Sequence, residues 1–436
     1  MDVRHINEHL LNGKANQPGV LPHLEELSQS KYVFATDFGL EQLPEIPGVL
    51  LIRGPRQYGK STWLEQQIFN TIKKYGPGTA FYLNSDELRD ADELIAEIRT
   101  VISLFKSAAT IKRIFIDEIT SIPNWERALK RLVDSGELRR VLVVTTGSKA
   151  ADLRHGTERL PGRKGRLGRT SYLFTPISYK EFKRVCGERL KERTLSSYLL
   201  SGGSPIACSE LGSNDRLPEF VTQMINDWVL GEFAVTGRSR SSLLGVLEVL
   251  HRYGATPVGQ AKLAREAGLA NNTVAQGYID LLGDLMCVIP AYSWDSSKRT
   301  LLRRRPCKYH FVNLLCATTW HPKKPKTADD FESLTSAEQG LYYEWLVAQE
   351  IWRRACIRGV EIPDSLAFWE SKEHEVDFVQ SPSDFIEVKR GHASPLQYDW
   401  FVKSHPKAKL VVINQARFET SSIRGITMED FLLEDA

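Results

Sequence analysis

One short segment constrains the fold of this chain more than any other. Residues 54–61 read Gly-Pro-Arg-Gln-Tyr-Gly-Lys-Ser, which is the GxxxxGK[ST] pattern of a phosphate-binding loop. The apolar run VLLIR enters the segment, and the helical pattern STWLEQQIF leaves it. In such loops, successive backbone N–H groups and the N-terminus of the following helix surround a phosphate. The sequence therefore predicts a strand–loop–helix unit that binds the phosphates of a nucleotide.

The fixed positions of this pattern have different tasks. Gly54 and Gly59 allow the backbone conformations that the loop needs. Lys60 would reach the β- and γ-phosphates, and the hydroxyl of Ser61 would ligate Mg²⁺. We therefore expect ATP and Mg²⁺ as cofactors. The expected nucleotide-binding residues are Gly54, Pro55, Arg56, Gln57, Tyr58, Gly59, Lys60, Ser61 and Thr62.

An acidic pair at the end of another apolar strand supplies the second half of such a site. In RIFIDEI, residues 113–119, Asp117 would hold Mg²⁺ through water and Glu118 would polarise the attacking water. The next apolar run, residues 141–148, ends in hydroxyl side chains, among which Thr146 could sense the γ-phosphate. The same hydroxyls could instead cap the end of a strand, so both interpretations stay open.

Strand and helix patterns alternate along this part of the chain. Apolar runs at 49–53, 79–84, 113–119 and 141–148 are separated by helical patterns. Such runs are typical of a parallel sheet that helices cover on both faces. The predicted fold class is therefore α/β, with a P-loop core of three layers.

Residues 257–310 show the pattern of a winged helix-turn-helix. A helix, a Gly-containing turn, a second amphipathic helix and an apolar hairpin follow one another. Base edges of DNA could be contacted from the start of the second helix by Asn271, Asn272, Thr273 and Gln276. Phosphates could be held by basic residues of the hairpin, namely Lys298, Arg299, Arg303, Arg304 and Arg305. Winged helices also serve as lids or protein-contact modules, so DNA contact is one of two interpretations.

A second set of chemically active residues lies in the last hundred residues. Glu344 is on a predicted helix, and Asp377 ends the apolar half of HEVDFV. The next strand, FIEVK, carries Glu387 and Lys389 on one face because side chains alternate along a strand. Asp377 and Glu387 could hold Mg²⁺ beside a phosphodiester, while Lys389 stabilises the charge or activates the water. A hairpin with solvated acids, and a fold that binds without cutting, are the two alternatives.

Composition and charge limit the class of protein. The 436 residues, 42% apolar and 25% charged, fit two to four globular domains. The net charge of +3 gives no overall signal for nucleic acid, although residues 154–169 carry five Arg and one Lys against a single Glu. Six scattered cysteines without a CxxC pattern suit a reducing compartment and argue against zinc. The chain has no apolar signal segment and no run near the roughly 18 residues of a membrane span. We therefore expect a cytoplasmic protein with no membrane partner.

The motifs of the first half resemble a known family, the prokaryotic and archaeal-type AAA+-like P-loop ATPases related to the STAND branch. The segments that carry the resemblance lie between residue 49 and about residue 185 and read GPRQYGKST, YLNSDE, FIDEITSIPNWERALK, TTGSKA, LPGR and TPISYKEF. It implies ATP hydrolysis in a ring-like oligomer, a hexamer or heptamer, and a turn containing Pro205 that closes over the nucleotide. It also implies an arginine finger supplied to a neighbouring subunit.

Four arginines compete for that finger: Arg159, Arg163, Arg166 and Arg169. Arg163 is the expected one because it lies in the LPGR segment of the resemblance. A solvated basic loop, or one that binds DNA phosphates, is the alternative.

The C-terminal set resembles the PD-(D/E)xK nucleases, in the order Glu344, Asp377, Glu387 with Lys389, and Gln397. The resemblance implies an α/β domain like that of restriction endonucleases. The chain would then divide into a helical lead-in at 1–48, the P-loop core at 49–177, a helical lid at 178–240, a winged helix at 241–320 and the nuclease-like domain at 332–436.

The expected function is that of an oligomeric, Mg-ATP-hydrolysing motor or switch that works on DNA. Duplex or branched DNA is the expected partner, and the nuclease-like domain would process it with a metal. The alternative is a STAND-like signalling or defence switch whose winged helix and tail bind protein.

Overall fold

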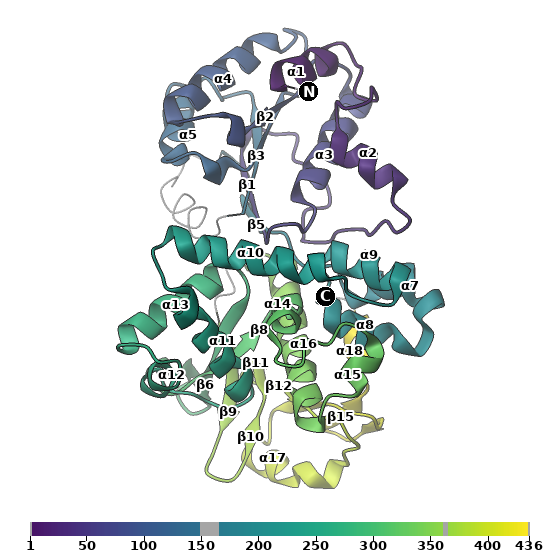
Figure 1. Cartoon of the computed structure of the whole chain (residues 1–436), viewed down its shortest axis with the longest axis vertical. Helices are drawn as coiled ribbons and strands as arrows, with labels where there is room; N and C mark the ends of the chain where they lie inside the picture. The colour runs from purple at the N-terminus through teal and green to yellow at the C-terminus, as the bar shows by residue number, and fades with distance from the viewer. Residues whose placement is uncertain (1, 149–164, 361–364, 435–436) are drawn as a thin grey trace. The chain divides into compact units, whose positions relative to one another are not determined.

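The computed structural model describes residues 2–148, 165–360 and 365–434. Its contacts group the chain into two compact units, residues 1–175 with 359–361 and residues 176–358 with 362–436 (Figure 1). Among the described residues, no helix is both long and apolar enough to cross a membrane.

The first unit is built around a parallel sheet. Its described strands are β1 (Gly48–Arg53), β2 (Ala80–Asn84), β3 (Arg113–Asp117), β4 (Leu142–Gly147) and β5 (Ser171–Leu173). Its described α-helices are α1 (Val3–Leu11), α2 (Pro22–Gln29), α3 (Lys60–Tyr75), α4 (Ala91–Leu104) and α5 (Trp125–Asp134), with 3₁₀ turns at Ser85–Glu87 and Ile119–Ser121. The described strands pair in parallel in the order β2-β3-β4-β1-β5, so the predicted α/β fold with a parallel P-loop core is confirmed.

This strand order decides which side chains can meet. Strand β4 lies between β1 and β3, with Ile52 opposite Thr146 and Ile116 opposite Thr145. Parallel strands end at the same edge of a sheet, so the phosphate loop after β1, the hydroxyls of β4 and the acids of β3 come together there. Separate apolar clusters pack on the two faces of the sheet, one with residues of α4 and α5 and the other with residues of α2 and α3.

The N-terminal segment belongs to this unit. The Asn7 side chain on α1 donates to the Tyr82 carbonyl and accepts from the Tyr82 N–H, each at 2.8 Å. Strand β2 is at the edge of the described sheet, so Asn7 satisfies backbone groups that another strand would otherwise pair.

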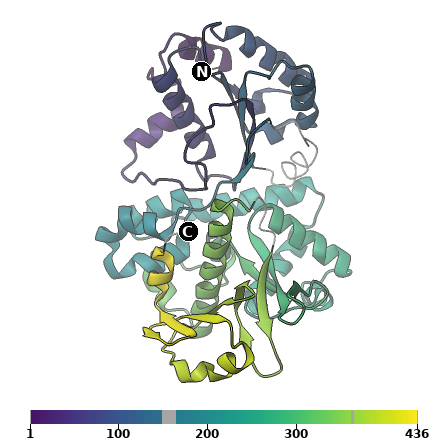
Figure 2. The ribbon, with the colours of Figure 1, turned by 180° about the vertical axis from the view of Figure 1, so that it is seen from behind.

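The second unit begins with helices. These are α7 (Tyr179–Leu190), α8 (Thr194–Ser201), α9 (Pro205–Asn214), α10 (Glu219–Val235), α11 (Arg240–Tyr253), α12 (Gln260–Glu266) and α13 (Asn272–Asp284), with a 3₁₀ turn at Lys191–Arg193. Further along the chain lie α14 (Leu314–Trp320), α15 (Ala328–Glu332), α16 (Ser336–Ile357), α17 (Asp399–Ser404), α18 (Met428–Leu433) and a 3₁₀ turn at Pro395–Tyr398. Helices α7 and α18, at the two ends of the unit, lie side by side (Figure 2). Tyr179 on α7 donates to Glu429 on α18 at 2.9 Å.

Two sheets organise the rest of this unit. The first contains β6 (Val288–Asp295), β7 (Thr300–Leu301), β8 (Lys308–Phe311), β9 (Leu366–Glu370) and β10 (Glu375–Val376). The second contains β11 (Phe378–Ser381), β12 (Asp384–Val388), β13 (Lys409–Ile413), β14 (Phe418–Glu419) and β15 (Ile423–Ile426). The expected helix that carries Glu344, here α16, and the expected hairpin, here β11–β12, are both present.

The sheets also join segments that the sequence suggested were separate. Strand β6 of the predicted wing pairs in parallel with β9 of the predicted nuclease-like segment, with Ala291 opposite Leu366. A wing hairpin alone would leave the backbone groups of β6 unpaired on that edge. The segment 321–331, between the two expected domains, packs within the unit, where the Leu217 N–H donates to the Lys326 carbonyl at 2.8 Å. The division of residues 176–436 into separate functional domains stays a prediction.

Candidate functional site

The phosphate loop contains residues with positive φ angles, as the glycines in its sequence predict. It connects β1 to α3, and Gly59, with φ of 89°, is the N-cap of α3. Gln57 also has a positive φ, 63°. L-residues rarely adopt these angles unless the loop is held in place. The first turn of α3 therefore points its free N–H groups at the space that the loop encloses.

Gly54 is required by close packing rather than by its backbone angles. A Cβ added there would lie 2.7 Å from the Phe174 Cβ and 3.0 Å from the Phe174 carbonyl oxygen. Phe174 is itself held by its N–H, which donates to the Arg53 carbonyl at 2.5 Å. The loop must move if residue 54 carries a side chain.

We expect Gly54→Ala to weaken ATP binding and to lower the free energy of unfolding by about 1–3 kcal/mol, the usual effect of overpacking. Fluorescent-nucleotide titration and thermal denaturation measure the two effects. Gly168→Ala is the matched control, because an added Cβ there meets nothing within 4 Å. Equal behaviour of the two variants would show that the loop tolerates the change.

Lys60 is buried at the centre of the loop. Its Nζ donates to the carbonyls of Gly54 at 3.0 Å and Pro55 at 2.8 Å, and it lies 3.8 Å from Glu118 Oε1. Burial lowers the pKa of Lys60, although the charges of Glu118 and Asp117 act in the opposite direction. The ammonium is thus held over the loop, close to the predicted catalytic acid.

Asp117 and Glu118 are joined to β4 by hydrogen bonds. The Thr146 hydroxyl bonds Asp117 Oδ1 and accepts the Glu118 N–H at 3.1 Å. Glu118 Oε2 accepts from both the N–H and the hydroxyl of Ser148, at 3.0 and 2.9 Å. Glu118 has φ of 47°, a strained conformation of the kind found where a side chain is held for function. The structure therefore brings Lys60, Asp117, Glu118 and Thr146 into one site.

The remaining loop residues surround this centre. Ser61 and Thr62 are half-buried in the first turn of α3, directly after Lys60. Arg56 is exposed, and its Nε donates to Ser148 Oγ at 3.4 Å. The Ser61 hydroxyl and the Asp117 carboxylate are oxygen donors, the kind that Mg²⁺ prefers. This donor set fits Mg²⁺ next to nucleotide phosphates.

Two expected nucleotide contacts are not placed at this site. Arg163, like Arg159, lies outside the described residues. Arg169 is engaged elsewhere, since its Nε donates to the Ser171 carbonyl at 3.1 Å and its guanidinium lies over the Tyr172 ring. Pro205 is the first residue of α9, in the second unit. The roles of Arg163 and Pro205 stay predictions.

The predicted helix-turn-helix has an exposed second helix. Asn272 and Thr273 are exposed at the start of α13, but Asn271 caps that helix by accepting the Val274 N–H at 3.0 Å. Gln276 donates to Asp280 at 2.6 Å on the same helix. Capping and this hydrogen bond therefore engage two of the four expected base contacts within the protein.

The C-terminal acids gather in one place. Asp377 lies between β10 and β11, its N–H donates to Glu387 Oε2 at 3.3 Å, and its Oδ2 accepts the Val388 N–H at 2.9 Å. Lys389 lies 2.7 Å from Glu387 Oε1. Because Asp377, Glu387 and Glu344 are all buried, the solvated-hairpin interpretation does not describe them.

A lysine that the sequence analysis did not single out stands among these acids. Lys308 on β8 lies 3.3 Å from Glu344 Oε1 and 3.2 Å from Asp377 Oδ1, and it also pairs with Glu375. Its side chain is completely buried. Burial opposes the charge of Lys308, but Glu344, Asp377 and Glu375 together outweigh it and raise the pKa. We call Lys308, Lys389 and the acids Glu344, Glu375, Asp377 and Glu387 the acid cluster.

The acid cluster does not fit the expected Mg²⁺ site as it stands. Burial, followed by the charge of Asp377, raises the pKa of Glu344 to about 8 and that of Glu387 to about 7. Both expected metal ligands, Asp377 and Glu387, already have a lysine partner. Among the described residues, no group of three or more acids, histidines or cysteines has an arrangement that could hold a metal.

An open groove of about 560 Å³ runs beside the acid cluster. Its walls include the basic residues Lys389 and Arg390 and also the acids Glu373, Glu375, Asp377 and Glu387. The rings of His374 and Trp400, also in its walls, stack at 4.1 Å with an interplanar angle of 4°. The groove is therefore of mixed charge, and its basic groups beside aromatic rings are a combination also found on surfaces that bind single-stranded nucleic acid.

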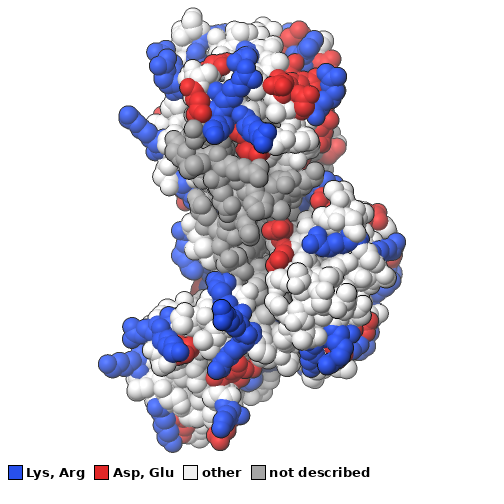
Figure 3. Space-filling view, turned by 90° about the vertical axis from the view of Figure 1, so that its left-hand side faces the viewer, with Lys and Arg blue, Asp and Glu red and all other residues white. Residues whose placement is uncertain are grey.

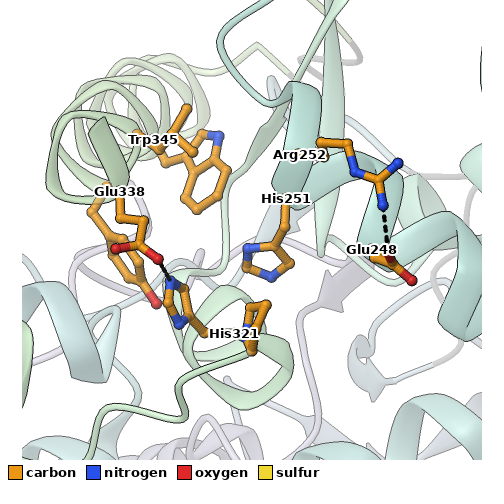
Figure 4. A pocket seen from close by; sticks show the side chains of 9 residues that line it. Glu248, His251, Arg252, His321, Glu338 and Trp345 are labelled. Carbon is orange, nitrogen blue, oxygen red and sulfur yellow. Dashed lines mark hydrogen bonds and ion pairs between the residues drawn. The ribbon is translucent and has the colours of Figure 1, made fainter. Parts of the chain in front are cut away.

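A second hollow, of about 210 Å³, lies between α11 and α16 (Figure 4). His251, Trp345 and His321 line it, and His321 Nε2 is 4.0 Å from Glu338 Oε1. Burial, together with the charge of His321, lowers the pKa of His251 to about 3, so its ring is neutral near pH 7. None of the residues that the sequence singled out lines this hollow.

Comparison with known proteins agrees with the geometry of the first unit. Residues 47–183 match the family model AAA_14, described as an AAA domain. The first unit carries a P-loop ATPase domain. Besides the whole phosphate site, the match includes β5 and the start of α7.

Two uncharacterised proteins of Methanocaldococcus jannaschii are similar to this chain. MJ1544 is 28% identical over 378 residues, which are 83% of this chain and 77% of that protein. MJ1637 is 26% identical over 161 residues, 35% of this chain and 33% of its own length. Among solved structures, the Walker-type ATPase PABY2304 of Pyrococcus abyssi has a TM-score of 0.43 at 15% identity, over 68% of this chain and 94% of that one.

Proposed function

We propose that the ATPase domain hydrolyses Mg-ATP and that the protein uses the reaction as a switch or motor on DNA. The observation that best supports hydrolysis is the approach of Lys60 to Glu118, 3.8 Å apart, with Glu118 fixed by Ser148. Positioned charges of this kind carry most of the catalysis in phosphoryl transfer.

Each residue has a distinct task in this proposal. The N–H groups of the loop and of the first turn of α3 bind the phosphates, and Lys60 neutralises charge on the β- and γ-phosphates. Ser61 and Asp117 would hold Mg²⁺, which neutralises further charge when bound. Glu118 orients and polarises the water that attacks the γ-phosphate.

The same contacts offer a way to sense the nucleotide. Ser148 accepts a hydrogen bond from Arg56 on the phosphate loop and donates one to Glu118. Thr146 joins Asp117 to the Glu118 backbone. A change at the γ-phosphate would therefore reach the end of β4, which fits Thr146 as a sensing residue.

DNA binding is the less direct part of the proposal. It is supported by exposed Asn272 and Thr273 on α13, by the wing arginines 303–305, and by the groove beside the acid cluster. On the face drawn in Figure 3, basic side chains of the described residues gather in several separate groups with acidic ones between them. Contact through these residues would rely on local groups of basic side chains.

We expect duplex or branched DNA to raise the steady-state ATPase rate several-fold at low salt. The increase should fall as salt rises, because phosphate contacts release counterions. Replacing Arg303, Arg304 and Arg305 by Gln should reduce the stimulation and leave the rate without DNA unchanged. The matched control is the triple substitution of Lys73, Lys74 and Lys106 by Gln.

A signalling switch that docks on protein is the second candidate. It is favoured by the engagement of Asn271 and Gln276 within the protein and by the mixed charge of the face in Figure 3. An ATPase rate that stays the same with every form of DNA would favour the signalling switch. Assembly into a ring, with Arg163 acting on a neighbour's ATP, is a further part of the proposal and rests on the sequence resemblance.

A further inference from the structure

The register of β8 aims Lys308 into the protein. Strand β8 pairs with β6, with Lys308 opposite Ala291 and His310 opposite Ile289. Alternation places Lys308 and His310 on the same face of the strand, and both side chains are completely buried. Lys308 passes over the Phe368 ring of β9, with Nζ 5.4 Å from the ring centre.

The ammonium of Lys308 ends among carboxylate oxygens from different elements. Glu344 comes from α16, Glu375 from β10, and Asp377 from the break between β10 and β11. A lysine ammonium has three N–H donors, and each has one carboxylate partner here. The positive charge of Lys308 therefore offsets the repulsion between these carboxylates, a task that a metal would otherwise have.

The other oxygens of the expected metal ligands are engaged as well. Asp377 Oδ2 accepts the Val388 N–H, and Glu387 Oε2 accepts the Asp377 N–H. Glu387 Oε1 pairs with Lys389, whose side chain is half exposed. Lys308 differs from Lys389 because its side chain is completely buried. A buried ammonium that lost these carboxylates would be strongly destabilising.

We propose that Lys308 is the resident cation of the acid cluster and stands where the sequence predicts a divalent metal. The ammonium of Lys308, which comes from the wing strand β8, thereby takes the place of a metal in the nuclease-like segment. The groove then binds a phosphodiester through Lys389 and Arg390 without a metal at Asp377. This inference deepens the proposed DNA contact but does not depend on ATP hydrolysis.

Binding of Mn²⁺ to the full-length protein, followed by electron paramagnetic resonance, tests the proposal. Wild type should bind no Mn²⁺ at the acid cluster, so wild type and Asp377→Asn should bind the same amount of Mn²⁺. Lys308→Met has a similar volume and no charge, and it should gain one Mn²⁺ per chain with at least about 10-fold higher affinity than wild type. The double variant Lys308→Met with Asp377→Asn should lose that ion.

Lys389→Met is the matched control, because it removes the more exposed lysine of the same cluster and should gain no comparable site. If folded Lys308→Met binds no more Mn²⁺ than wild type, the proposal is overturned. If Lys308→Met does not fold, wild type and Asp377→Asn decide: an Asp377-dependent Mn²⁺ in wild type overturns the proposal, and its absence supports it. ATP turnover does not enter this measurement, so failure of the proposed ATPase would be seen separately.

Discussion

Glu118→Gln is expected to lower the steady-state rate of ATP hydrolysis by about 100-fold or more and to leave ATP affinity nearly unchanged. The amide keeps the size of the side chain and can still bond Ser148, but it cannot take up a proton from the attacking water. In the structure Glu118 is positioned by Ser148 at the end of β4 and lies 3.8 Å from Lys60. Phosphate release and fluorescent-nucleotide titration measure the two quantities.

Glu137→Gln is the matched control for this variant. Glu137 is a carboxylate of the same unit, but it pairs with Arg99 at 2.8 Å instead of facing the phosphate loop. Its loss should leave turnover at the wild-type level. Normal turnover in Glu118→Gln would remove Glu118 from the proposed mechanism.

Lys60→Ala is expected to weaken ATP binding by about 10- to 100-fold, the usual effect of losing a hydrogen bond between charged groups. Lys60 is buried, and its Nζ is held by the carbonyls of Gly54 and Pro55 at the position from which it would reach the phosphates. Hydrolysis should fall as well, because the same ammonium neutralises charge in the transition state. Nucleotide titration at several ATP concentrations separates the two effects.

The control for this variant is Lys73→Ala in the last turn of the same helix, α3. Lys73 is exposed, so its loss removes the same charge without touching the loop. Both variants should keep the wild-type unfolding transition within a few degrees. ATP affinity that is equal in Lys60→Ala and Lys73→Ala would contradict the role of Lys60.

The phosphate site could be predicted because its signals are local. Residues 54–61 contain the loop, and Asp117 and Glu118 follow an apolar strand whose pattern is equally clear. Parallel strands bring their carboxyl ends to one edge, so the convergence of these segments follows from the fold class. For Thr146 the sequence left two interpretations open, a phosphate-sensing residue or a hydroxyl that caps a strand end. Thr146 meets Asp117 because β4 lies between β1 and β3, which only the structure shows.

The acid cluster could be predicted only in part, because one of its residues joins it through a contact between distant segments. Glu344, Asp377 and Glu387 could be predicted from their order along helix and hairpin. Lys308 could not, because it reaches them through the parallel pairing of β6 with β9, a contact between segments more than seventy residues apart. The one available signal was a lysine beside the apolar run that ends this segment, FVNLL, because a charge drawn into a buried strand requires a partner.

The middle segment shows a different limit. The two helices and the hairpin of the winged pattern were expected and are present as α12, α13 and the strands β6 to β8. The same residue types serve both capping and base contact, so sequence could not show that Asn271 caps α13. Asn272 and Thr273 are therefore better candidates for contacts outside the protein.

The most direct test of the central claim is the release of phosphate from ATP by the purified full-length protein in the presence of Mg²⁺. Wild type should carry out many turnovers per chain, and the rate should disappear on chelation of the metal and in Glu118→Gln. Lys60→Ala, prepared in the same way, gives the background from contaminating ATPases. A wild-type rate no higher than that background, with nucleotide binding intact and every DNA form tested, would contradict the assignment of this protein as an ATP-hydrolysing enzyme.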